Sequence, residues 1–81
     1  MPHRLWLPHI DGQTHKVEIT WTSWTKGGEL YIDDIQTQAW KSDFSGGMTK
    51  VFEVANKPAL LKPTNKSYDL FIEGKELKGI G

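Results

Sequence analysis

Cysteine is absent from this 81-residue chain, and so is any excess of charge of one sign. Without cysteine the fold has no disulfides or thiolate metal sites, and it must be held together by packing alone. Ten Lys and Arg balance ten Asp and Glu, so no concentrated charge favours nucleic acid or an anionic membrane as a partner. The N-terminal stretch MPHRLWLPHIDG has prolines and an acid where a signal peptide needs an apolar run. These absences predict a single cytoplasmic domain over residues 1–81.

Helical periodicity is also missing. Apolar residues nowhere recur at spacings of three and four over three turns, and eight glycines and four prolines interrupt the chain. Alternation takes its place: in HKVEITWT, Val17, Ile19 and Trp21 fall on one side, while Glu18 and Thr20 fall on the other. A period of two is typical of a half-buried strand.

Three related stretches interrupt the alternation: HIDGQT from His9, YIDDIQ from Tyr31 and FIEGKE from Phe71. Each places an isoleucine before an acid and a second turn residue, and Asp-Gly is a strong signal for a two-residue hairpin. We expect each isoleucine to reach the core and each turn pair to tolerate a positive φ. Geometry therefore explains the recurrence without a shared function.

The complete pattern predicts an all-β domain. Strands are expected over residues 5–10, 15–22, 29–33, 35–40, 48–54, 59–62, 68–72 and 75–80, with a break at NKP before residue 59. Seven or eight short strands do not bury both faces of one open sheet, so they predict an antiparallel β-sandwich or a partly closed barrel.

Tryptophan is abundant, with four residues in the chain. Trp6 lies between two leucines and Trp21 is in phase with Val17 and Ile19, so both are expected in the core. Trp24 lies in the polar stretch TSWTKGG, and Trp40 is out of phase with Ile35, Thr37 and Ala39 in IQTQAW. The candidate binding surface is Trp24 and Trp40 together with Gln36 and Gln38. Exposed rings would stack on sugars or anchor a protein, and the alternative is packing against lysine stems or the second sheet.

The spacing of histidines and acids in the sequence gives little support for a metal site. His3, His9 and His15 are spaced by six residues, and the last two would approach one another across a hairpin at Asp11-Gly12. A zinc site would want a further Cys, Asp or Glu at a defined spacing. The acids near Asp33 and Asp43 lack the spacing of a calcium loop. We therefore predict no metal and no cofactor.

Catalytic constellations are missing as well. The polar phase of their strands places Glu18 and Glu53 in solvent, where a carboxylate pair for glycoside hydrolysis has no support. The chain has no Ser-His-Asp order, glycine-rich phosphate loop or nucleophile elbow. The sequence predicts no catalytic residue and a protein that is not an enzyme.

Two runs carry a resemblance to a known family. DGQTHKVEI, from Asp11 to Ile19, follows a tryptophan, and YDLFIEGKEL, from Tyr68 to Leu77, closes the domain. Between them stand GGELYIDD, a tryptophan before a lysine, and an F-x-V strand. In this order the features resemble the first domain of the Fas apoptotic inhibitory molecule family, from about residue 5 to about residue 78. The chain departs from the family in having one domain rather than two, and Asp-Asp in place of the usual Asp-Gly at its second turn.

The resemblance implies a compact, non-enzymatic cytosolic β-sandwich. Animal relatives modulate death-receptor signalling and, by some accounts, limit the aggregation of misfolded proteins. A protein partner and weak self-association through a sheet edge are the expectations that follow. The alternative is a carbohydrate-binding module that uses exposed tryptophans.

Overall fold

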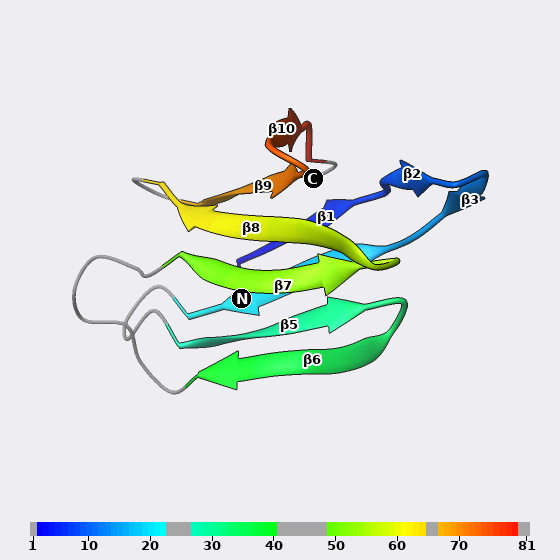
Figure 1. Ribbon diagram of the computed structural model, residues 1–81. Helices are drawn as coiled ribbons and strands as arrows, with labels where there is room; N and C mark the ends of the chain where they lie inside the picture. Colours follow the sequence, from blue (N-terminus) through cyan, green and yellow to red (C-terminus); the bar gives the residue numbers. More distant parts are fainter. Residues whose placement is uncertain (1, 23–26, 41–48, 65–66, 80–81) are drawn as a thin grey trace.

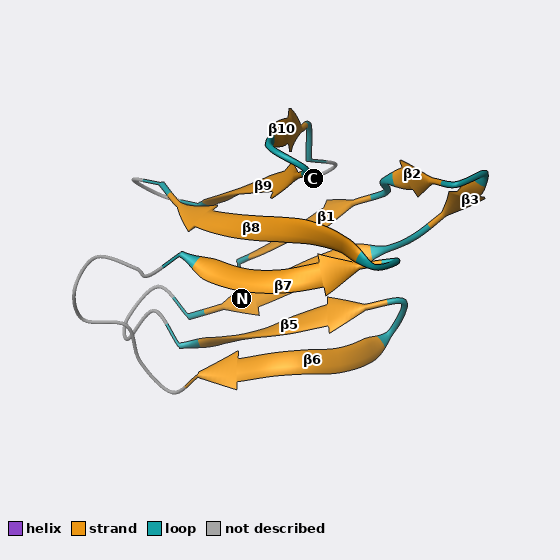
Figure 2. Cartoon of the chain, viewed as in Figure 1, coloured by secondary structure: helices purple, strands orange, loops and turns teal. Residues whose placement is uncertain are grey.

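A computed structural model describes residues 2–22, 27–40, 49–64 and 67–79 of the chain. These residues form ten strands and no helix (Figure 2). The strands are β1 (His3–Trp6), β2 (His9–Ile10), β3 (Gln13–Thr14), β4 (Val17–Trp21), β5 (Gly28–Ile32), β6 (Ile35–Trp40), β7 (Lys50–Val54), β8 (Lys57–Pro63), β9 (Tyr68–Ile72) and β10 (Lys75–Leu77). The described part of the chain has no helix long and apolar enough to cross a membrane.

The strands form two antiparallel sheets of four, in the orders β1-β4-β5-β6 and β10-β9-β8-β7, and a short β2-β3 ribbon. Figure 1 shows the two sheets as separate layers, with the ribbon extending from one end. Within the described residues the sheets do not close into a barrel. The all-β antiparallel sandwich predicted from the sequence is confirmed.

The first hairpin has two arms, each made of two strands: β1 and β2 form one arm, and β3 and β4 form the other. His3 pairs with Thr20 and Ile10 pairs with Gln13 in one unbroken register. The amide of His15 donates to the carbonyl of Pro8 at 2.8 Å between the two paired segments. One bent hairpin therefore runs from β1 to β4, and ten strands arise where eight were expected because each of its arms is divided in two.

The core lies between the sheets. Its central side chains are fully buried and come from both layers, namely Trp6, Val17, Ile19, Leu30, Val54, Leu61 and Leu70. Trp21 of β4 and Tyr68 of β9 meet edge to face, with ring centroids 5.1 Å apart and planes at 72°. That geometry suits the quadrupoles of two aromatic rings and adds specificity to the burial of apolar area. The predicted core positions of Trp6 and Trp21 are confirmed.

Four two-residue turns lie at one end of the sandwich, which we call the hairpin end. They are Asp11–Gly12, Asp33–Asp34, Ala55–Asn56 and Glu73–Gly74, and all eight residues have positive φ. Two positive φ values in succession define the type I′ turn, whose twist matches that of the strands it joins. The isoleucines before three of these turns reach the core or its margin: Ile10, Ile32 and Ile72. The explanation of the three related stretches as hairpin corners is confirmed.

The turn at Ala55–Asn56 corrects the sequence analysis, which placed a break at NKP. Here Val54 pairs with Lys57, and β8 runs through Pro58. Proline is tolerated in this central strand for two reasons. Val54 and Lys57 are the hydrogen-bonded pair beside the turn, so the next pair, Glu53 and Pro58, needs no hydrogen bond from the proline to β7. Pairing with β9 begins one residue later, at Ala59. The carbonyl of Pro58 accepts a hydrogen bond from the amide of Glu73 at 2.9 Å.

Ala55 is the residue least suited to its backbone. It has a φ of 51°, and a left-handed conformation costs an ordinary L-residue about 1–2 kcal/mol. We expect Ala55→Asn to stabilise the domain by about 0.5–1 kcal/mol, because asparagine visits this region readily. Urea unfolding followed by tryptophan fluorescence measures the change. Ala39→Asn, at an exposed position of β6 without positive φ, is the matched control, and an equal gain there would contradict the turn explanation.

Candidate binding surfaces

The four residues of the predicted binding surface are not brought together within the described structure. Trp24 lies outside the described residues. Gln36 is exposed and pairs across the ladder with Tyr31. Gln38 and Trp40 lie farther along β6 and are half-buried. Trp40 packs against the core cluster, and the ammonium of Lys50 lies 4.6 Å from its ring centroid. Trp40 therefore takes the packing alternative that the sequence analysis left open.

A β-bulge explains why alternation mispredicts the inward side of β6. Leu30 pairs with Gln38 but Tyr31 pairs with Gln36, so Thr37 is the extra residue. Cross-strand partners share a face, and beyond the bulge Gln38 and Trp40 share the inward face of Leu30. Ile35, before the bulge, is 70% exposed.

The ring of Trp40 packs beside Gly28, which has no side chain. Gly28 is the cross-strand partner of both Trp21 and Trp40. A Cβ atom there would lie 2.3 Å from the carbonyl oxygen of Thr20 and 3.1 Å from the Trp40 ring, so the missing side chain makes room for both. The pairing of Gly28 with Trp40 depends on the register after the bulge, so no local sequence pattern marks Trp40 as inward.

The edges of the two sheets are fastened to each other by side chains. On one side the amide of Gln38 donates to the carbonyl of Val51 at 3.0 Å, joining edge strands β6 and β7. On the other side the guanidinium of Arg4, on β1, donates to the carbonyl of Tyr68 at 3.0 Å and lies 3.7 Å from the carboxylate of Asp69. These contacts occupy groups that an edge strand otherwise offers to another chain.

A polar cluster at the hairpin end joins the Asp33–Asp34 turn to His15 and Lys16, which lie just before β4. Nδ1 of His15 lies 2.8 Å from Oδ2 of Asp33, whose other oxygen accepts from the main-chain amide of Lys16 at 2.8 Å. The ammonium of Lys16 donates to Asp34 at 2.7 Å. His9 and His15, which the sequence analysis weighed as metal ligands and set aside, lie beside other side chains, since Nδ1 of His9 lies 3.1 Å from the hydroxyl of Thr14. The described residues hold no group of three or more His, Cys, Asp or Glu suited to a metal ion.

The same contacts shift two ionisations. The hydrogen bond from His15, followed by that from the Lys16 amide, lowers the pKa of Asp33 from its ordinary 3.8. The hydrogen bond to Asp34 raises the pKa of Lys16. Both charged forms are therefore favoured in the folded state, which ties the Asp33–Asp34 turn to the start of β4.

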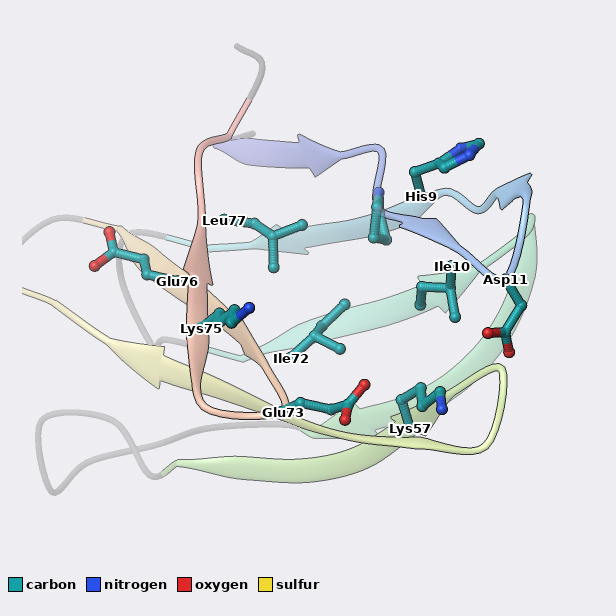
Figure 3. A pocket seen from close by; sticks show the side chains of 10 residues that line it. His9, Ile10, Asp11, Lys57, Ile72, Glu73, Lys75, Glu76 and Leu77 are labelled. Carbon is teal, nitrogen blue, oxygen red and sulfur yellow. The ribbon is translucent and has the colours of Figure 1, made fainter.

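A cleft of about 430 Å³ opens at the hairpin end between the β2–β3 ribbon and the β9–β10 hairpin. Figure 3 shows Ile10, Ile72 and Leu77 directed into it, with charged side chains around them. The cleft is lined by Pro8, His9, Ile10, Asp11, Lys57, Ile72, Glu73, Lys75, Glu76 and Leu77. Its floor is apolar and its rim carries both signs of charge. No local sequence pattern marks this site, since its parts come from turns far apart along the chain.

The rim charges are not paired with one another. The ion pairs of the described residues involve His3, Arg4, His15 and Lys16 with their acids. None of them includes the three acids or two lysines of the cleft, which are Asp11, Glu73, Glu76, Lys57 and Lys75. These groups keep their full capacity for a charged ligand.

An apolar row crosses the solvent face of the β10-β9-β8-β7 sheet. Val51 pairs with Leu60, which pairs with Phe71, so the three side chains lie side by side on β7, β8 and β9. Val51 is 70% exposed, and Leu60 and Phe71 are half-buried. The ammonium of Lys62 lies 4.8 Å from the centroid of the Phe71 ring. We call Val51, Leu60 and Phe71 the apolar row.

Comparison with known proteins yields no assignment. No family model matches the chain, and searches of the curated proteins and of the solved structures find no match either. Function must therefore be argued from the surfaces described above.

Acid titration tests the polar cluster. A lowered pKa means that Asp33 stabilises the fold above its ordinary pKa of 3.8 and that this stability is lost as pH falls through the folded value. We expect Asp33→Asn to remove part of the acid-induced loss of stability, with a small effect because the side chain is 47% exposed. Urea midpoints from neutral to acid pH measure it. Asp11→Asn, at a turn outside the cluster, should keep the parent profile, and a parent profile for Asp33→Asn would contradict the assignment.

Proposed function

We propose that this chain is a non-enzymatic, cytosolic protein-interaction domain of the Fas apoptotic inhibitory molecule type. The observation that carries the proposal is the apolar row, an aliphatic and aromatic strip on the solvent face of a sheet. Apolar patches on a surface mark places where another protein docks. The proposed kinship adds two animal roles, regulation of apoptosis and protection against protein aggregation, of which the second needs only a surface that holds exposed apolar segments.

The position of the row supports contact with unfolded rather than folded partners. It follows one cross-strand line over three strands and begins at edge strand β7. A narrow apolar line suits an extended segment better than a broad folded surface, because an extended chain presents alternate side chains to one side. Lys62, beside Phe71, and the exposed Glu53 of β7 keep the surroundings of the row polar.

The carbohydrate-binding alternative has less support. Two of the three described tryptophans, Trp6 and Trp21, are buried, and the third, Trp40, packs against the core. A flat exposed pair of rings, which stacking on sugars requires, is not formed by the described tryptophans. That hypothesis would rest on Trp24.

Aggregation of a client protein tests the proposal. We expect the chain to reduce the light scattering of reduced lysozyme at equimolar concentration, and Val51→Lys to weaken this protection at least twofold. A charge in the apolar row removes its contact with exposed apolar segments, while a surface substitution of this kind changes stability by only about 0.5 kcal/mol. Ile35→Lys is the matched control, since Ile35 and Val51 are both 70% exposed and Ile35 lies outside the row.

Two results would count against the proposal. The parent chain would leave scattering unchanged at every ratio, or Ile35→Lys would impair protection as much as Val51→Lys. Urea midpoints for both variants show that each is folded under the conditions of the assay.

A further inference from the structure

We propose that the cleft at the hairpin end binds an extended peptide segment of a partner protein, with an aliphatic–basic–aliphatic pattern, as an added strand beside β10. This proposal rests on the proposed function, because both require a protein partner, and it adds the chemical class of the segment that is bound. It concerns a second surface with its own chemistry, and it is tested by a different measurement.

The backbone of β10 has one side open to another strand. Within the described residues β10 pairs with β9 alone, at the edge of its sheet. The two-residue turn makes Ile72 and Lys75 a hydrogen-bonded pair, so the alternation of the antiparallel ladder turns the amide and carbonyl of Glu76 away from β9. These groups are the donor and acceptor that an incoming strand would use.

The wall of the cleft opposite β10 offers a similar main-chain donor and acceptor. In the β2–β3 ribbon, Ile10 and Gln13 flank the turn, so the main-chain groups of His9 point away from β3. His9 and Glu76 both line the cleft. An extended chain lying between β2 and β10 would therefore find backbone partners on two sides.

Farther from the hairpin end, Arg4 fills part of the gap between the sheets on this side of the described structure. Arg4 of β1 reaches the carbonyl of Tyr68, and a Cβ atom added to Gly79 would lie 2.6 Å from the Arg4 guanidinium. The chain after β10 thus passes against Arg4 and closes the gap. The cleft lies toward the hairpin end, where residues of β2 and β10 line it from opposite sides (Figure 3).

The register of β10 specifies the side chains of the occupant. Lys75 and Leu77 pair with Ile72 and Leu70, both buried, so they share the inward face, whereas Glu76 pairs with Phe71 on the solvent face. A strand added beside β10 continues the same alternation. Its residues opposite Lys75 and Leu77 would face the apolar floor, and the residue between them would stand beside the carboxylate of Glu76.

Charge favours a basic residue at that middle position. The cleft has three acids, Asp11, Glu73 and Glu76, against two lysines, Lys57 and Lys75. None of the five takes part in the ion pairs of the described structure. A volume of about 430 Å³ lies in the range of ligand pockets, which is about 300–1,000 Å³, and accommodates the aliphatic side chains.

Titration with two designed peptides tests the proposal. The probes are short, end-blocked peptides with a Thr-Val-Lys-Val-Thr centre and the same peptide with Glu in place of Lys. In ¹H–¹⁵N spectra of the labelled chain we expect shifts at His9, Ile10 and β10, and at least tenfold tighter binding of the lysine peptide. The double variant Glu73→Lys and Glu76→Lys should reverse this preference, while Glu53→Lys, on β7 outside the cleft, should keep it.

A proline substitution tests the main-chain contact separately. Glu76→Pro removes an amide hydrogen that points away from β9, so the hairpin survives while the added strand loses its donor. We expect loss of peptide binding with the tryptophan fluorescence of the folded chain preserved. Glu76→Gln is its control for the lost charge, and it should weaken binding less than tenfold.

Three outcomes would overturn the proposal: equal binding of both peptides, parent-like binding by Glu76→Pro, or concentration-dependent shifts at β10 without peptide, which would make a second copy the occupant. Failure here leaves the proposed function standing if Val51→Lys still impairs protection of the client. Conversely, peptide binding without any client protection would remove the aggregation role and retain the cleft.

Discussion

Left-handed backbone at the four turns is the constraint on which the rest of this structure depends. Each turn consists of two residues, and all eight have positive φ. Such a turn permits one register between its strands, and a slip by one residue would send every core side chain to solvent. With the registers fixed, Ile10, Ile32 and Ile72 arrive at the core, and the ends of four hairpins gather at one end of the sandwich. The cleft exists because three of those ends meet there.

The residues that carry the family resemblance have structural tasks in this molecule. His15 and Lys16, from the run DGQTHKVEI, bind the turn of YIDD through Asp33 and Asp34. The two quoted motifs are therefore halves of one contact between neighbouring hairpins. Asp34 stands where the family usually has glycine, and its carboxylate gives Lys16 an ion-pair partner in return for a less favourable φ of 68°. Because these positions have structural tasks, the resemblance at them carries no argument about function, which must come from the surfaces.

Local patterns were sufficient for most of the fold. Alternation identified the inward face of β4, and turn chemistry located three of the four corners, because both signals are confined to a few neighbouring residues. The corner at Ala55–Asn56 escaped because alanine is a poor turn residue and Pro58 resembles a strand breaker. Whether the sheet tolerates Pro58 depends on where β9 begins to pair with β8, and β9 lies outside the β7–β8 hairpin that contains this proline. The bulge at Thr37 reversed the expected face of β6 for a similar reason, since an extra residue is visible only when the partner strand is known.

The binding surfaces were harder to predict, since they join residues that have no local relation. The apolar row is a line across three strands, and the cleft combines the first, third and fourth turns of the chain. Register nevertheless connects the two surfaces. Phe71, at one end of the row, pairs with Glu76 at the rim of the cleft. A strand bound beside β10 would extend the same sheet, and its outward residue would continue the line of Val51, Leu60 and Phe71 past Glu76. One extended partner would then place its inward side chains in the cleft and its outward side chains at the end of the apolar row, beyond Glu76.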